Sequence, residues 1–201
     1  MAAAGVSLAA VRQAPTAWSS VPEHLQIEVA LSLVLEDGLA LRDLPGHLQT
    51  TAVVSAAVEQ NGLALRFVAD AALTVEMVLA AVSENGLALQ YAEGWLTHEV
   101  VAAAVEQNPL CLQYAAEWLE TAPDDLDFDD VLMRAVGLNG MALQYVPDYL
   151  IHPLMAMEAV GQNGLSLQYV PARCIDRDCA FEEPHVTVDQ VMLTAVRQNG
   201  L

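Results

Sequence analysis

The sequence predicts an all-α fold, an α-solenoid of stacked two-helix repeats of about 24 residues. A seven-residue segment that begins Asn-Gly-Leu recurs along the chain, most clearly at residues 85–91. An apolar stripe with helical spacing precedes most copies. The copies are also evenly spaced, because five of the seven intervals between them measure 23 or 24 residues. The anchor positions are 14, 37, 61, 85, 108, 139, 163 and 199.

The segment before each anchor has the pattern of a helix. Counted from the anchor, apolar residues stand at positions −8, −7, −4 and −3, which is one stripe of a helix with 3.6 residues per turn. Alanine at −4 recurs in seven of eight copies and predicts a close approach of neighbouring helices. The glycine after the anchor is expected to end the helix in the left-handed conformation. Thr50, Thr74, Thr97 and Thr187 are expected N-caps, and Pro153 fits a first helical turn.

The segment after each anchor is shorter and predicts a second helix. Proline recurs at position +8, where it must break a helix, so we expect a short helix followed by a separate turn. The alternative is an α/β leucine-rich-repeat-like horseshoe, since Leu-x-Leu-x-Tyr alternates as a strand does. Alanine and glutamine at +3 and +5 are poor strand formers and favour the helix. The +8 prolines are Pro22, Pro45, Pro147 and Pro171.

We expect a single helical-repeat array over residues 1–201, with insertions at 120–130 and 173–186. Residues 2–10 are apolar but lack the basic region of a signal peptide, so we interpret them as helix. No apolar run reaches the ~20 residues that cross a bilayer, and we therefore expect a cytoplasmic protein. Residues 199–201 begin another unit, and an uncapped stack predicts end-to-end self-association.

The first insertion carries five aspartates within residues 124–130. A calcium loop of the EF-hand type would need Gly and Glu where, counted from Asp125, this chain has Asp130 and Val136. We therefore expect a solvated loop whose last acids complement the dipole of the following helix.

The second insertion holds Cys174, Cys179 and His185, which are candidate zinc ligands. A closed zinc site needs four ligands, so a disulfide and a simple polar insertion remain open as well. Cys111 occupies the +3 position, where other copies have alanine, and is expected to be a small core residue.

The chain is strongly acidic. The chain has 26 Asp and Glu against seven arginines and no lysine, for a net charge of −19. Nucleic acids and anionic membranes are bound through basic patches, so both are disfavoured as partners. The charge would suit a basic protein partner, and compositional bias that implies no partner is the open alternative. We find no phosphate-binding loop, zinc-protease motif or nucleophile elbow, and expect no catalytic residue, no cofactor, no bound metal and no enzymatic activity.

A polar residue recurs at position +5. Stacked repeats would align these residues as a ladder that could recognise an extended peptide. Alternatively, the position could simply face solvent on a short helix, or its side chain could form a hydrogen bond between repeats. The aromatic residues at +10, Trp95, Trp118 and Tyr149, are expected to pack in the core or at its rim. The ladder residues are Gln90, Gln113, Gln144 and Gln168, with Arg42 and Arg66 in earlier copies.

The units at residues 78–92 and 101–115, which share Ala-Val, Asn, Leu-x-Leu-Gln-Tyr-Ala in register, resemble the repeat called domain of unknown function 4116. The resemblance covers residues 50–119 and 131–171 and departs from the family at the +8 prolines and both insertions. That family implies no activity and supplies no catalytic residues. We expect a non-catalytic scaffold for protein–protein interaction, or alternatively a regulatory or targeting module of a larger, possibly enzymatic protein.

Overall fold

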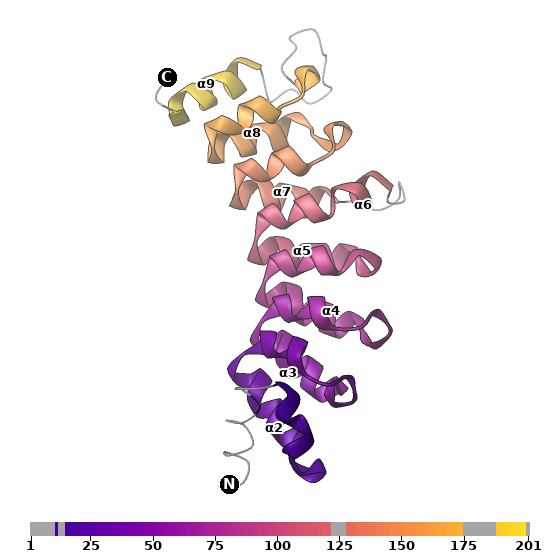
Figure 1. Cartoon of the computed structure of the whole chain (residues 1–201). Coiled ribbons are helices and arrows are strands. Elements are labelled where there is room, and N and C mark those ends of the chain that lie inside the picture. Colours follow the sequence, from indigo (N-terminus) through magenta and orange to yellow (C-terminus); the bar gives the residue numbers. More distant parts are fainter. Residues whose placement is uncertain (1–10, 12–14, 122–127, 175–187, 200–201) are drawn as a thin grey trace. The chain divides into compact units, whose positions relative to one another are not determined.

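The structure is a computed structural model that describes residue 11 and residues 15–121, 128–174 and 188–199 (Figure 1). It divides into two compact units, residues 1–95 and 96–201. Every regular element among the described residues is a helix, so the all-α prediction is confirmed and the horseshoe with strands is wrong. The predicted helix over residues 2–10 and the predicted cap Thr187 lie outside the described residues.

Unit 1 alternates α-helices with 3₁₀-helices. A six-residue 3₁₀-helix follows each α-helix, and a separate three-residue turn follows that, as the +8 prolines and the apolar pattern predict. The elements are η1 (Pro15–Ser20), α2 (Glu23–Glu36), η2 (Gly38–Asp43), η3 (Gly46–Leu48), α3 (Thr51–Gln60), η4 (Gly62–Phe67), η5 (Asp70–Ala72), α4 (Val75–Glu84), η6 (Gly86–Tyr91) and η7 (Glu93–Trp95).

Unit 2 follows the same scheme, with one α-helix, α6, in place of the three-residue turn. Its elements are α5 (His98–Gln107), η8 (Pro109–Tyr114), α6 (Ala116–Thr121), α7 (Asp129–Leu138), η9 (Gly140–Tyr145), η10 (Asp148–Leu150), α8 (Pro153–Gln162), η11 (Gly164–Tyr169), η12 (Ala172–Cys174) and α9 (Val188–Asn199).

Each unit has two layers. Successive α-helices pack on one another, successive six-residue 3₁₀-helices do the same, and the apolar stripes meet between the layers. In α3 the four stripe residues, Val53, Val54, Ala57 and Val58, are all buried. The 3₁₀-helix η4 contributes Ala64 and Leu65 from positions +3 and +4. The core is therefore a column of Val, Leu and Ala that continues through each stack.

The anchor asparagine joins the two kinds of helix. The Asn61 N–H donates to the Ala57 carbonyl at 2.9 Å and closes α3, while its side-chain oxygen accepts the Leu63 N–H at 3.1 Å and caps η4. Its backbone is extended, with φ of −152°. Asn85, Asn139 and Asn163 repeat this geometry. The chain therefore turns at the asparagine, and the prediction that a left-handed glycine ends the helix is wrong.

The glycine after the anchor is required by a close approach of backbones. A Cβ on Gly62 would lie 2.1 Å from the carbonyl oxygen of Ala81 in the next repeat. A Cβ on Gly38 would lie 2.4 Å from the Ala57 carbonyl oxygen, and a Cβ on Gly140 would lie 2.3 Å from the Ala159 carbonyl oxygen. This contact explains two recurring residues together, since the −4 alanine carries the carbonyl that the glycine of the preceding repeat meets.

The same glycines donate a hydrogen bond to the next α-helix. The Gly38 N–H donates to Gln60 Oε1 at 2.6 Å, the Gly62 N–H to Glu84 Oε2 at 2.7 Å, and the Gly140 N–H to Gln162 Oε1 at 2.7 Å. We call this bond the repeat clasp. Proline 109 has no N–H to donate, and the position that would accept from it carries Leu138, so both members of that clasp are replaced.

The observed caps at the helix N-termini agree only in part with those predicted from the sequence. The Thr74 and Thr97 hydroxyls accept the Met77 and Val100 N–H groups at 3.4 and 3.3 Å, which confirms these caps. Thr50 is the N-cap of α3, but its side chain makes no capping bond. Pro153 lies in the first turn of α8, as expected. No helix in the described part of the chain combines the length and apolar character needed to cross a bilayer.

Candidate functional site

The ladder glutamines lie on the outer side of the 3₁₀ layer. In unit 2, Gln113 on η8, Gln144 on η9 and Gln168 on η11 are all exposed, and these three helices pack in that order. Gln90 lies on η6 in unit 1, where the two preceding six-residue 3₁₀-helices, η2 and η4, carry Arg42 and Arg66. Each unit thus presents its own row of polar +5 side chains.

A local hydrogen bond fixes most of these amides. Nε2 of Gln90, Gln113 and Gln144 donates to the carbonyl of the residue three positions earlier, at 2.9, 3.1 and 3.0 Å. The bond satisfies a carbonyl of the 3₁₀-helix and holds the amide against its own turn. Because a glutamine amide has two donor hydrogens and an acceptor oxygen, one N–H and Oε1 remain to meet a ligand.

An apolar row runs beside the glutamine row. In a 3₁₀-helix residues three apart share one side, so positions +2 and +5 both face solvent. Position +2 is leucine or methionine, and Leu165 is 58% exposed; Tyr114 at +6 is 38% exposed. We define the 3₁₀ face of unit 2 by the side chains at +2, +5 and +6: Leu110, Gln113, Tyr114, Met141, Gln144, Tyr145, Leu165, Gln168 and Tyr169.

Unit 1 has a related surface with a positive group in place of an amide. The Arg66 guanidinium carbon lies 4.8 Å from the ring centroid of Phe67 and 5.9 Å from that of Tyr91. A guanidinium at this distance is attracted to the face of an aromatic ring.

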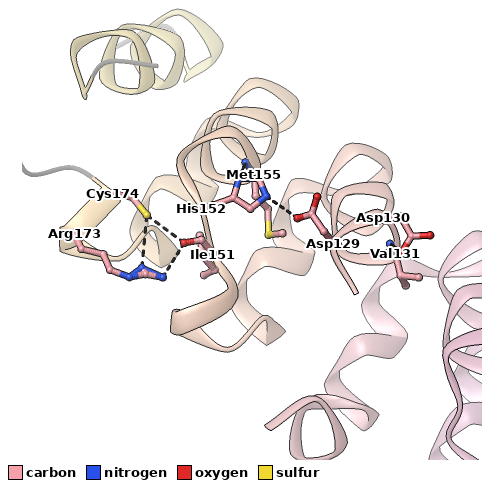
Figure 2. Close-up of polar contacts among 8 residues, drawn as sticks. All are labelled: Asp129, Asp130, Val131, Ile151, His152, Met155, Arg173 and Cys174. Carbon is pink, nitrogen blue, oxygen red and sulfur yellow. Dashed lines mark hydrogen bonds and ion pairs between the residues drawn. The ribbon is translucent and has the colours of Figure 1, made fainter. Parts of the chain in front are cut away.

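Two His–Asp pairs connect the N-termini of α-helices in unit 2. His98 Nε2 lies 3.1 Å from Asp130 Oδ1. His152 Nε2 lies 2.7 Å from Asp129 Oδ1, and Figure 2 shows this second pair. His152 Nδ1 also accepts the Met155 N–H at 3.3 Å as the N-cap of α8, so its ring proton is on Nε2. The hydrogen bond from His98 lowers the pKa of Asp130. The last two acids of the first insertion thus occupy the first turn of α7, as predicted.

The first insertion also contains a buried aromatic residue that sequence reasoning missed. Phe128 is buried, packs edge-on against Trp118 with ring centroids 5.0 Å apart, and stacks with His98 at 6.1 Å. The interpretation of this stretch as a solvated loop is therefore wrong at Phe128. Trp118 packs at the rim as expected, whereas Tyr149 is exposed and its hydroxyl donates to the Leu119 carbonyl at 3.0 Å.

Cys174 lies at the start of the second insertion and is buried. Its Sγ donates to the Ile151 carbonyl at 3.4 Å, and the Arg173 guanidinium donates to the same carbonyl at 2.7 Å (Figure 2). The Arg173 guanidinium also donates to the Asp148 carbonyl. These contacts tie η12 to the end of η10. Cys179 and His185, the other candidate zinc ligands, lie outside the described residues, and the described residues hold no group of three or more His, Cys, Asp or Glu suited to a metal.

Two open grooves stand out among those in the described part of the chain. One, of about 660 Å³, is lined in unit 1 by residues that include Gln26 and His47, whose side chains lie 3.3 Å apart. The other, of about 260 Å³, lies between α5 and α7, where Arg134 donates to Glu106 at 2.7 Å and lowers the pKa of that carboxyl. Cys111 is a core residue, as predicted, and burial raises the pKa of its thiol to about 12, far from a reactive nucleophile.

The comparison with known protein families supports the repeat pattern. The family model described as domain of unknown function (DUF4116) matches residues 75–120, 97–151 and 129–175, and each match spans two anchor asparagines. No curated protein and no solved structure matches the chain. The three overlapping matches together run from residue 75 to residue 175, and the chain belongs to the DUF4116 family.

Proposed function

We propose that the chain is a non-catalytic scaffold for protein–protein interaction and that the 3₁₀ face of unit 2 binds an extended segment of a partner. The observation that carries this proposal is the pairing of two rows on one surface. Exposed glutamine amides at +5 stand beside partly exposed Leu, Met and Tyr side chains at +2 and +6. Amides recognise backbone, and the apolar row accommodates side chains.

The repeat spacing selects the shape of the partner. Packed helices stand ~8–10 Å apart. An extended or polyproline II chain advances ~3.1–3.3 Å per residue, so three residues of such a chain match one repeat. A partner in this conformation would place every third residue over a Leu–Tyr pair and offer a backbone N–H to each Gln Oε1. The net charge of −19 favours a basic segment.

A random-peptide display selection against the purified chain tests the proposal. Enriched peptides should carry an apolar residue at every third position and an excess of Lys and Arg. Gln113→Ala, Gln144→Ala and Gln168→Ala combined should weaken binding of a selected peptide at least tenfold, measured by fluorescence anisotropy, with an unchanged circular dichroism spectrum. The matched control, Glu99→Ala with Glu158→Ala, removes exposed side chains from the α-layer and should leave the affinity within twofold.

Two results would count against this function. Selection that enriches no periodic motif would show that the face does not recognise an extended chain. Equal affinities of the triple variant and the α-layer control would place the binding surface elsewhere.

A further inference from the structure

Unit 1 carries an arginine whose hydrogen-bond donors are not used within the described protein. Arg66 on η4 is exposed, and no carboxylate or carbonyl in the described part of the chain accepts a hydrogen bond from it. Arg42 and Arg134 differ, because they donate to Asp43 at 3.2 Å and to Glu106 at 2.7 Å. Since acids outnumber arginines 26 to seven, such pairing within the chain is the state expected of an arginine.

Arg66 lies against aromatic rings in place of an acid. Its guanidinium carbon is within 6 Å of the ring centroids of Phe67 and Tyr91, and both rings are half-buried. The attraction acts between the positive charge and the ring faces, so it leaves the five N–H donors of the guanidinium available. Because two rings already favour one placement of this long side chain, a ligand that binds the N–H groups orders it at a lower entropic cost.

The neighbouring arginine limits the ligand to one negative charge. Arg42 occupies the same position on η2, the preceding six-residue 3₁₀-helix, but its guanidinium is bound to Asp43. Arg66 therefore offers one uncompensated positive charge. A carboxylate carries one negative charge, and its two oxygens match the planar fork of a guanidinium. A phosphate group carries about −1.5 to −2 charges and would need a second cation, so the carboxylate is the better match.

The next 3₁₀-helix adds a group that binds peptide backbone. Gln90 on η6 is exposed, and η6 packs against η4. Its amide donates to the Leu87 carbonyl at 2.9 Å and keeps one N–H and Oε1 for other partners. The polar row of unit 1 thus places an amide suited to a backbone next to a guanidinium suited to an acid, an arrangement that fits a protein segment.

We propose that Arg66 binds the carboxylate of an aspartate or glutamate in an extended segment of a partner protein, and that Gln90 binds the backbone of the same segment. This inference rests on the proposed role of the 3₁₀ layer in binding partners, but it uses unit 1 and none of the residues of the 3₁₀ face of unit 2. At physiological salt the Debye length is ~8 Å, so repulsion from distant acids of the chain is largely screened, whereas the contact pair at Arg66 persists.

A peptide-display selection with a depletion step tests the site. Random peptides are first depleted on Arg66→Gln and then selected on the wild-type full chain in about 0.15 M NaCl. The variant gives η4 the residue that η6 carries at this position, so it should fold normally. Surviving peptides should carry Asp or Glu at one enriched position. Replacement of that acid by its amide should raise the Kd at least about fivefold, measured by fluorescence anisotropy.

Two further variants separate the guanidinium from a general effect of charge. Arg66→Lys keeps the charge but loses the planar fork, so it should recover only a small part of the affinity. Arg197→Gln is the matched control. Arg197 is exposed on α9 and likewise donates to no acceptor in the described part of the chain, so its replacement removes the same charge from unit 2. It should leave the Kd within twofold.

Several results would overturn the proposal. These are surviving peptides without an enriched acid, equal losses of affinity in Arg66→Gln and Arg197→Gln, and tighter binding of a peptide that carries phosphoserine in place of the acid. The variant with Gln113→Ala, Gln144→Ala and Gln168→Ala combined should bind the acidic peptide as wild type does. A loss in that variant would place the acidic peptide on unit 2 and overturn the assignment to Arg66, whereas failure of the unit 2 face alone would leave this binding unchanged.

Discussion

At the scale of single residues, the glycine that follows most anchors allows the close approach of neighbouring repeats. Gly62→Ala would place a methyl group 2.1 Å from the Ala81 carbonyl oxygen, in a contact between two backbones that cannot rotate away. Overpacking of this kind costs about 1–3 kcal/mol, and we expect the upper part of that range in the free energy of unfolding. Urea denaturation followed by circular dichroism measures it.

Gly94→Ala is the control for this change. A Cβ on Gly94 meets nothing within 4 Å, so this variant should be neutral or slightly more stable. Equal losses in both variants would mean that the conformational freedom of glycine, and not the close approach, accounts for the recurring residue.

A second residue-scale prediction concerns acid. The hydrogen bond from His98 lowers the pKa of Asp130 in the folded chain, so on acidification the unfolded chain takes up that proton first. The contribution is complete above the ordinary aspartate pKa of about 4 and is lost as pH falls through the lowered value. Asp130→Asn should therefore melt below wild type at pH 6, with the difference shrinking toward pH 2.5.

Melting temperatures of wild type and Asp130→Asn, measured by circular dichroism from pH 2.5 to pH 6, test this prediction. The effect is small because the Asp130 side chain is 73% exposed. A difference that is constant over this range would show that the carboxylate charge contributes nothing and that only the hydrogen-bonding shape matters.

At the scale of elements, the N-caps provide a comparison within one protein. The Thr74 and Thr97 hydroxyls cap α4 and α5, whereas the Thr50 side chain makes no capping bond at the same position of α3. Thr74→Ala and Thr97→Ala should each lower the free energy of unfolding by about 1 kcal/mol, a typical loss for a cap. Thr50→Ala should cost distinctly less in the same urea denaturation, and a loss as large as the other two would contradict the capping geometry.

The sequence predicts the α-helices better than the elements that follow them. The apolar pattern at positions −8, −7, −4 and −3 predicts which side of the helix is buried. The residues at these positions are buried in α3, α4, α5, α7 and α8. The 3₁₀ character of the second helix was not predicted because this helix is only six residues long, with or without a proline at +8, and six residues are too few for a periodic pattern to distinguish the helix type. The repeat clasp could have been predicted from the sequence, because glycine and its acceptor are replaced together by Pro109 and Leu138. The burial of Phe128 was harder to predict, since the only indication is a single aromatic residue within an acidic run.

At the scale of the whole molecule, repetition makes the fold predictable and the ligand unpredictable. Each repeat repeats the same contacts, so one interpreted unit predicts the others, and the two insertions are where that reasoning stops. The ladder positions Gln113, Gln144 and Gln168 were predicted because they recur, and the structure shows that they are exposed. Recurrence alone does not assign them a ligand, since a residue repeated for stacking and one repeated for recognition give the same pattern.

The charge of the whole molecule supplies the last prediction. Seven arginines cannot neutralise 26 acids, so the folded chain carries a net repulsion that salt should screen. We expect the melting temperature to rise by several degrees between about 10 mM and about 500 mM NaCl. Glu59→Gln, Glu117→Gln and Glu158→Gln combined, all at exposed positions, should melt higher than wild type at low salt and respond less to added NaCl. A melting temperature that falls with salt would mean that attractive pairs such as Arg134–Glu106 outweigh the repulsion.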